Sequence, residues 1–114
     1  MLWLSQDGNM WHNQTAEWIS NSINAAMGRF QEANPGFSVN AVPIANDNYQ
    51  EKFRVALAAD SVPDIFMHWS GGPMVSYINA GALADLTEYM NKDNYKDQFM
   101  DGAISQATYD GKLW

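Results

Sequence analysis

Strand-like and helix-like segments alternate along the chain, and this alternation constrains the fold more than any other feature of the sequence. Apolar residues recur at helical spacing over 15–33 and again over 49–59, which predicts two amphipathic helices. Residues 2–5, 37–41 and 63–67 have the apolar or alternating character of strands. The order strand, helix, strand, helix, strand predicts an α/β fold, in which a parallel sheet carries helices on both faces.

Residues that favour caps and turns mark the ends of the two helices. Asn13 or Thr15 is predicted to cap the start of the first helix, and Glu17 adds favourable negative charge to its first turn. The sequence Asn34-Pro35-Gly36 predicts the end of this helix, because proline cannot continue it and glycine accepts a reversed backbone. Asn46-Asp47-Asn48 is predicted to cap the second helix.

The last part of the chain predicts smaller elements. A short helix is predicted from the Gly-Gly-Pro sequence at 71–73 to residue 78, and irregular helical turns follow. The Asp-Gly pair at 110–111 is typical of a tight hairpin turn, so residues 112–114 would begin its second strand. A small parallel sheet would leave a long edge open. We therefore expect residues 1–114 to form part of a larger lobe with an incomplete sheet.

The composition excludes several classes of function. The 13 acidic residues outnumber the 6 basic ones and give a net charge of −7, which would repel nucleic acid and anionic membrane surfaces. No apolar run approaches the ~20 residues that cross a bilayer, and the start of the chain has no recognisable signal sequence. The absence of cysteine excludes disulfides, thiolate metal sites and cysteine nucleophiles.

A binding site for a small polar molecule is predicted at one edge of the sheet. In open α/β sheets, ligands bind outside the carboxyl ends of the strands, where we expect the loops 6–11, 44–48 and 68–72. Amides and carboxylates in these loops would hydrogen-bond hydroxyl groups, and an indole face would stack on a sugar ring. The candidate ligand-binding residues are Gln6, Asp7, Trp11, Asp47, His68, Trp69, Ser70 and Gly71.

For several aromatic and polar residues, an ordinary structural role is the alternative to ligand binding. Asp47 is explained as a helix cap more readily than as a ligand contact, and His68 is either a ligand contact or a residue at a strand end. Trp18, beside the apolar stripe of the first helix, is predicted to be half-buried packing, and Trp3 is predicted to lie in the core. Trp69 is the favoured indole, because it follows a strand and precedes a glycine pair.

Support for catalysis is weak, and no catalytic residue, metal site or cofactor is predicted. His12 and His68 are far apart and belong to no metal-binding motif, and the Gly-x-Ser-x-Gly motif of serine hydrolases is absent. A small carbohydrate-active hydrolase would use Asp7 and Asp47 as its carboxylate pair, since Asp64 begins a strand at the opposite end. A third hypothesis is an interaction or assembly module, in which open sheet edges lead to a dimer or a segment swap.

Five sequence blocks extend, in order, over essentially the whole chain. They are 30–36 (FQEANPG), 49–53 (YQEKF), 63–66 (PDIF), 80–87 (AGALADLT) and 109–114 (YDGKLW). Together they resemble the extracellular solute-binding proteins (family 1 type) of bacterial ABC sugar importers.

The resemblance implies a non-enzymatic component of an ABC transporter. Its members have two lobes of the periplasmic-binding-protein (type II) fold, with a mono- or oligosaccharide held in the cleft between them. Permease subunits in the membrane are the implied partners, and the implied location is extracytoplasmic, either in the periplasm or lipid-anchored at the cell surface. Residues 1–114 resemble the first part of the N-terminal lobe, which the remainder of the parent chain would complete. The resemblance assigns ligand contacts to Gln6, Asp7, Trp69 and Ser70.

Overall fold

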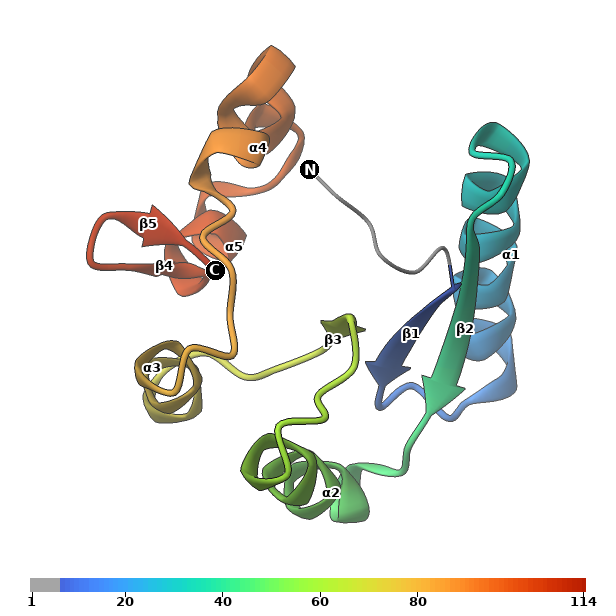
Figure 1. Ribbon diagram of the computed structural model, residues 1–114. Coiled ribbons are helices and arrows are strands. Elements are labelled where there is room, and N and C mark those ends of the chain that lie inside the picture. The colour runs from blue at the N-terminus through green and yellow to red at the C-terminus, as the bar shows by residue number, and fades with distance from the viewer. Residues whose placement is uncertain (1–6) are drawn as a thin grey trace. The chain divides into compact units, whose positions relative to one another are not determined.

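A parallel sheet organises the first part of the chain (Figure 1). In the computed structural model, which describes residues 7–114, this sheet has three strands in the order β2-β1-β3. The strands are β1 (Asp7–His12), β2 (Ser38–Pro43) and β3 (Ile65–Phe66). β1 pairs with β2 along its whole length, from Asp7 opposite Ser38 to His12 opposite Pro43, whereas β3 adds only the pairs Met10–Ile65 and Trp11–Phe66. The predicted parallel sheet is confirmed.

The first strand lies later in the chain than its sequence pattern predicts. The strand predicted over 2–5 and the core position predicted for Trp3 lie outside the described residues. Residues 7–11, which are predicted to be the following loop, are part of β1 itself. The loop prediction is therefore wrong from Asp7 onward. Gly8 and Asn9 disfavour a strand by local preference, but pairing on both edges of β1 outweighs that preference.

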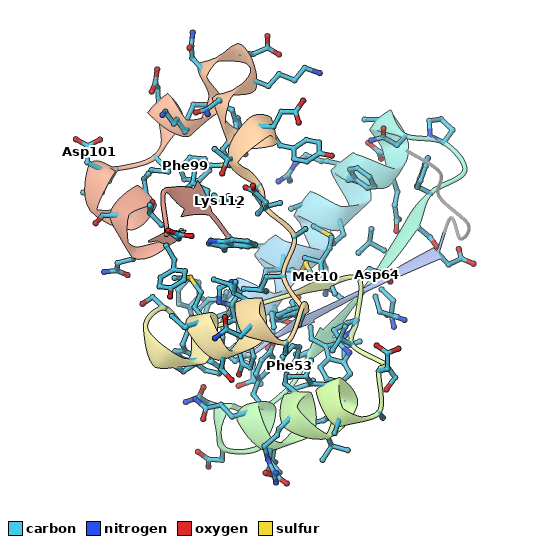
Figure 2. All side chains as sticks on the ribbon, turned by 60° about the vertical axis from the view of Figure 1, so that its left-hand side comes forward. Met10, Phe53, Asp64, Phe99, Asp101 and Lys112 are labelled. Atoms are coloured by element: carbon cyan, nitrogen blue, oxygen red, sulfur yellow. The ribbon has the colours of Figure 1, made fainter. Side chains whose placement is uncertain are left out.

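The helices α1 (Glu17–Ala33) and α2 (Asn46–Ala58) lie on opposite faces of the sheet. Met27 of α1 lines a cavity together with Ile65 of β3, whereas the ring of Phe53 of α2 lies 4.3 Å from the ring of Phe66. Because neighbouring residues of a strand point to opposite faces, these contacts place the two helices on different sides. Figure 2 shows Phe53 between α2 and the strands. The prediction of helices on both faces is confirmed.

Both helices start with alanine rather than with the polar caps that the sequence predicts. The N-cap residues are Ala16 and Ala45, and among the described residues no side chain makes the capping hydrogen bond at either position. The predicted capping roles of Asn13, Thr15 and 46–48 are therefore wrong. The predicted end of α1 is correct, since the chain leaves the helix at Asn34 and Gly36 has a φ of +94°.

The chain divides after Met67 into a first unit and a second unit, His68–Trp114. The second unit is built from short elements, namely α3 (Gly72–Asn79), α4 (Thr87–Asn91), the 3-10 segment η1 (Lys92–Gln98), α5 (Asp101–Gln106), β4 (Thr108–Tyr109) and β5 (Lys112–Leu113). β4 and β5 pair as an antiparallel hairpin, and both turn residues have positive φ, +54° at Asp110 and +74° at Gly111. Such a turn matches the right-handed twist of paired strands, and the predicted hairpin and α3 are confirmed.

Hydrogen bonds attach the hairpin to the start of α4. The backbone N–H of Leu86 donates to the carbonyl oxygen of Leu113 at 2.8 Å, and the N–H of Leu113 donates to Thr87 Oγ1 at 2.9 Å. The hydroxyl and backbone N–H of Thr87 both donate to Asp85, and these bonds lower the pKa of that carboxyl. Within residues 7–114, none of the helices has the length and apolar character needed to span a membrane.

Candidate functional site

A chain of side-chain amides joins the carboxyl ends of β1 and β2. Gln14 Nε2 donates to Asn13 Oδ1 at 2.9 Å, and Asn13 Nδ2 donates to Asn46 Oδ1 at 3.0 Å. Figure 1 shows that the start of α1 lies at this same edge of the sheet. Side chains with both donors and acceptors suit a ligand whose hydroxyl groups also donate and accept. We call Asn13, Gln14 and Asn46 the amide rim.

His12, the last residue of β1, holds the backbone of the amide rim through a hydrogen bond. Its side chain is only 5% exposed, and its Nδ1 accepts a hydrogen bond of 3.1 Å from the backbone N–H of Gln14. Burial lowers the pKa of His12, because the charged imidazolium loses its hydration. Since an unprotonated Nδ1 is needed to accept the Gln14 bond, the neutral ring holds the backbone at the start of the rim.

Tyr49 of α2 fixes the spacing between the ends of β1 and β3. Its side chain is 1% exposed. Its hydroxyl lies 3.1 Å from the carbonyl oxygen of Trp11 and 2.7 Å from that of Met67, so its proton is shared between them. The backbone N–H of Met67 also donates to the Trp11 carbonyl at 2.9 Å. These bonds hold the carboxyl ends of β1 and β3 together, at the edge of the sheet that carries the amide rim.

Two of the predicted ligand residues, Trp11 and Asp47, lie toward this carboxyl edge. Trp11 is half-buried within β1 rather than in a loop, and the ammonium group of Lys52 lies 5.7 Å from the centre of its ring. That geometry is a cation–π contact, which fixes the indole against α2. Asp47 is exposed in the first turn of α2, where its charge favours the helix start.

Asp7 lies at the amino end of β1, opposite the amide rim, so its predicted place in a loop at the carboxyl ends of the strands is wrong. It is the first residue of β1, and its Oδ1 accepts a hydrogen bond of 2.5 Å from Ser38 Oγ at the start of β2. Asp64 lies at this same amino edge, as predicted, where its Oδ2 accepts from the N–H of Asn9 at 2.9 Å. Gln6 lies outside the described residues.

The positions of Asp7 and Asp47 argue against a glycoside hydrolase that uses these two residues as its carboxylate pair. β1 has 6 residues, and at ~3.3 Å a residue it separates the two edges of the sheet by roughly 17 Å. Paired catalytic carboxylates lie about 5–9.5 Å apart. Asp7 is at the amino edge and Asp47 follows Asn46 of the amide rim, so these two carboxylates do not form such a pair.

Four predicted ligand residues, at 68–71, follow β3 after Met67 and belong to the second unit. His68 and Ser70 line a cavity of about 340 Å³, with Met74, Ala103, Gln106, Ala107 and Trp114 as the remaining lining residues. The ring of His68 meets the ring of Tyr77 edge to face, with 6.3 Å between centroids, and burial raises the pKa of the Tyr77 hydroxyl.

Trp69, which lies between His68 and Ser70 in the sequence, is half-buried, and Gly71 is the N-cap residue of α3. Gly71 has a φ of +80°, and a Cβ added to it would meet nothing within 4 Å. The glycine is therefore needed there for its backbone conformation rather than for close approach.

Two members of the amide rim were not expected at the site, since Asn13 was predicted only as a cap and Gln14 had no predicted role. Asn46 lies in the predicted binding loop 44–48, although it was also assigned to a cap cluster. Trp18 is 74% exposed, so its prediction as half-buried packing is wrong. The sequence could have shown the place of the rim only through the position of the first strand, because a strand predicted at 7–12 places residues 13–14 directly after its carboxyl end.

In the part of the chain that the structure describes, His, Asp and Glu side chains form no group of three that could hold a metal ion.

Comparisons with known proteins agree with this fold. The family model of the "Bacterial extracellular solute-binding protein" matches residues 14–111. A structure from work on xylan utilization by the thermophilic bacterium Caldanaerobius polysaccharolyticus is similar, with a TM-score of 0.84 and 30% identity over 95% of this chain and 27% of that chain. The comparison with curated proteins gives no match.

Two further solved structures share the fold. A chitin oligosaccharide binding protein has a TM-score of 0.83 and 26% identity, and covers 93% of this chain and 28% of its own. A cyclo/maltodextrin-binding protein complexed with maltotetraose has a TM-score of 0.75 and 26% identity, and covers 96% of this chain and 27% of its own. The chain thus spans 27% or 28% of the length of these similar proteins.

The predicted periplasmic-binding-protein-like (type II) fold is confirmed by these likenesses. The resemblance noted in the five sequence blocks is also confirmed, since the family match covers all but the first 13 and last 3 residues of the chain (14–111 of 114). The similar structures named above are binding proteins or come from carbohydrate utilization. The chain belongs to the bacterial extracellular solute-binding protein family.

Proposed function

We propose that this chain supplies part of the sugar-binding lobe of an ABC importer's solute-binding protein. In this proposal, residues 1–114 are the first part of the N-terminal lobe, and a mono- or oligosaccharide binds in the cleft that the complete protein forms. The similar proteins with at least 25% identity include ones named for xylan utilization, chitin oligosaccharide and maltodextrin. Their names support a carbohydrate ligand.

The amide rim is the observation that carries the proposal. Asn13, Gln14 and Asn46 are linked to one another rather than spent on capping α1 and α2. They lie at the carboxyl edge of a parallel sheet, which is where α/β proteins bind ligands. His12 accepts a hydrogen bond from the backbone N–H of Gln14, and this anchor together with the bonds among the amides pre-organises them to exchange hydrogen bonds with sugar hydroxyls.

The proposed role is that of a receptor rather than an enzyme. Closure of the lobes around a sugar would present a surface to the membrane permease, and the location would be extracytoplasmic, in the periplasm or lipid-anchored. Candidate contacts in the second unit are His68, Trp69, Ser70 and Gly71. In the first unit they are Trp11 and Asp47, in addition to the amide rim.

Titration calorimetry on the full-length protein that contains these residues tests the proposal. The panel pairs xylose with xylotriose, N-acetylglucosamine with chitotriose, and glucose with maltotriose. We expect at least one sugar to bind, and Asn13→Ala to weaken its binding about 3- to 10-fold through the lost hydrogen bonds. Asn21→Ala is the matched control, since Asn21 is an exposed amide within α1. The absence of heat with every sugar, or release of reducing sugar from an oligosaccharide, would contradict the proposal.

The isolated 114-residue chain is expected to self-associate rather than to bind sugar tightly. β2 and β3 are the edge strands of the sheet within the described residues, and Ile65 of β3 is 54% exposed. Open edges and exposed apolar residues favour pairing between copies, as a dimer or a segment swap. Light scattering over a concentration series tests this expectation, and a strict monomer at high concentration would rule it out.

A further inference from the structure

Asp-Gly pairs occur three times in the chain, at 7–8, 101–102 and 110–111, and each pair lies in a different backbone setting. An aspartate that precedes glycine can rearrange its own backbone without an enzyme. From the settings of the three pairs, we propose that Asp110 is a site of spontaneous isoaspartate formation and that secondary structure protects the other two aspartates. This proposal concerns the hairpin itself and does not depend on the proposed function.

The reaction joins the side chain of the aspartate to the backbone of the glycine. The backbone nitrogen of Gly111 attacks Cγ of Asp110, a C–N bond forms, and one carboxyl oxygen leaves as water with the carboxyl proton and the amide proton. Water then opens the resulting succinimide. Opening at Cγ restores aspartate, whereas opening at the backbone carbonyl carbon leaves the chain running through Cβ and Cγ, as isoaspartate. Glycine permits the attack because it has no Cβ beside the nitrogen.

The turn between β4 and β5 leaves the pair at 110–111 open to this reaction. Asp110 and Gly111 are both exposed, and among the described residues the N–H of Gly111 donates no hydrogen bond. The φ of Asp110 is +54°, a left-handed conformation that is unfavourable for a residue with a Cβ. The attacking nitrogen is therefore accessible, and rearrangement relieves an unfavourable backbone conformation.

The pair at 7–8 lies in a paired strand. Asp7 and Gly8 are opposite Ser38 and Val39 of β2, and the Asp7 carboxylate accepts a hydrogen bond from the hydroxyl of Ser38. Ring closure at Asp7 would require the strand to separate from β2 and the carboxylate to leave the hydroxyl. Opening of a paired strand costs free energy that an exposed turn does not require.

The pair at 101–102 occupies the first two positions of α5. Both of its residues are exposed, so exposure does not distinguish it from the pair at 110–111. The backbone N–H of Ala103 donates to the carbonyl of Met100 at 2.9 Å, across the backbone of Asp101. Ring closure would turn that backbone out of its helical conformation and break this bond. Asp101 is therefore a matched comparison, with the same dipeptide and exposure but a helical backbone.

Isoaspartate at Asp110 would loosen the attachment of the hairpin to the second unit. The rearrangement adds a carbon atom to the main chain, so the turn no longer fits the pairing of β4 with β5. β5 carries the bonds from the N–H of Leu86 to the carbonyl of Leu113, at 2.8 Å, and from the N–H of Leu113 to Thr87 Oγ1, at 2.9 Å. Trp114, the next residue, lines the cavity of about 340 Å³. A change in an exposed turn would thus reach the wall of that cavity.

Peptide mapping by mass spectrometry tests the proposal on the full-length protein, aged at neutral pH in water labelled with heavy oxygen. Each opened succinimide takes up one labelled oxygen. Trypsin leaves Asp101 and Asp110 in one peptide, 97–112, within which fragmentation locates the label. We expect label at Asp110 at least about 10-fold faster than at Asp7, with Asp101 between them. In protein unfolded by guanidinium chloride, the three sites should label at similar rates, because the same dipeptide is then free at each.

Equal rates at the three sites in the folded protein would overturn the proposal, as would faster labelling at Asp101 or no label at Asp110. Hydrogen exchange tests the consequence for the hairpin. In the aged wild type the amides of Leu86 and Leu113 should lose protection, whereas Asp110→Glu, which would need a six-membered ring, should keep it. An equal loss of protection in both proteins would show that ageing loosens the hairpin by another route and would overturn the role of Asp110.

Discussion

The two units of the chain are stabilised in different ways. In the first unit, Tyr49 and Phe53 are each 1% exposed, and a parallel sheet joins segments that are distant in the sequence. In the second unit the buried apolar residues are Met74 and Leu113, and most of the large apolar residues that remain exposed in residues 7–114 are found there. Short helices, a tight turn and hydrogen bonds between neighbouring segments hold it together.

This difference teaches where precision in a binding site comes from. The backbone of the amide rim is anchored to the buried His12, so the packing of the first unit determines where the rim begins. The cavity that His68 and Ser70 line is formed by residues in and between short helices and strands. Units with few buried contacts open more easily than a packed core does. We expect the first unit to hold its polar side chains more rigidly than the second unit holds its own.

The largest expected effect comes from removing the core of the first unit. Phe53→Ala deletes a ring that packs on Phe66 at 4.3 Å and should lower the free energy of unfolding by about 3–5 kcal/mol. Urea denaturation measures the loss, and amide hydrogen exchange locates it. Val55→Ala, on the same helix but 58% exposed, should cost less than about 0.5 kcal/mol. An equal loss of protection in both units would show that they unfold together, contrary to the comparison.

A turn in the second unit gives the next effect in size. Gly111→Ala places a Cβ where φ is +74° and should destabilise the hairpin by about 1–2 kcal/mol. Gly102→Ala is the control, because a Cβ at this second residue of α5 would meet nothing within 4 Å, and it should stabilise by up to about 1 kcal/mol. Thermal unfolding of the two variants should move in opposite directions. Similar shifts for both would contradict the role of the turn.

The hydroxyl that holds the strand ends together gives a smaller effect. Tyr49→Phe keeps the ring in the core but removes the donor to the Met67 carbonyl at 2.7 Å, which should cost about 1 kcal/mol. Hydrogen exchange should rise at the amide of Met67, which donates to Trp11. Tyr95→Phe, at a residue 47% exposed, should leave stability unchanged. An unchanged Tyr49→Phe protein would mean that the hydroxyl does not stabilise the sheet.

The smallest expected effect is a difference between the two units in how their stability depends on pH. Burial lowers the pKa of His12 below its ordinary value of 6.5, so the unfolded chain binds the proton first and the first unit loses stability as pH falls below about 6.5. The pKa of Asp85 is lowered below 3.8, so its contribution in the second unit is retained until the pH falls through that lower range.

Variants of these two residues test the assignment. His12→Gln should flatten the stability profile between about pH 7.5 and 5.5, because the titrating ring is gone. Asp85→Asn should leave that part of the profile as it is and remove only the loss at strongly acidic pH. Denaturation midpoints measured across pH check both expectations. A wild-type profile that is flat near pH 6 would refute the role of His12.

The alternation of segments was enough to predict the parallel sheet, both long helices and the hairpin, because each depends on local periodicity or turn chemistry. The position of β1 could not be predicted in this way. Asp7, Gly8 and Asn9 favour turns locally, and they become a strand through pairing with β2 and β3. That error displaced the predicted site, since Asp7 and Trp11 were assigned to a loop.

The capping residues illustrate a second limit. Asn13 and Asn46 have the side chains that normally cap helices, yet each bonds to the other across two strands. Such a bond depends on the register of β1 against β2, which is a property of the assembled sheet. The exposure of Trp18 likewise follows from its place one position before the apolar stripe that starts at Ile19, a distinction that periodicity alone left unresolved.

The order β2-β1-β3 also has a consequence for how the chain acquires its structure. The central strand is the first to be synthesised, but its partners follow 31 and 55 residues later, as the contacts Asp7–Ser38 and Asn9–Asp64 show. Both edges of β1 therefore stay unpaired while α1 and α2 form locally on the emerging polypeptide. Non-local pairing slows folding and prolongs the exposure of unpaired edges. We expect the first unit to be the kinetic bottleneck of folding, even though it is the better packed of the two.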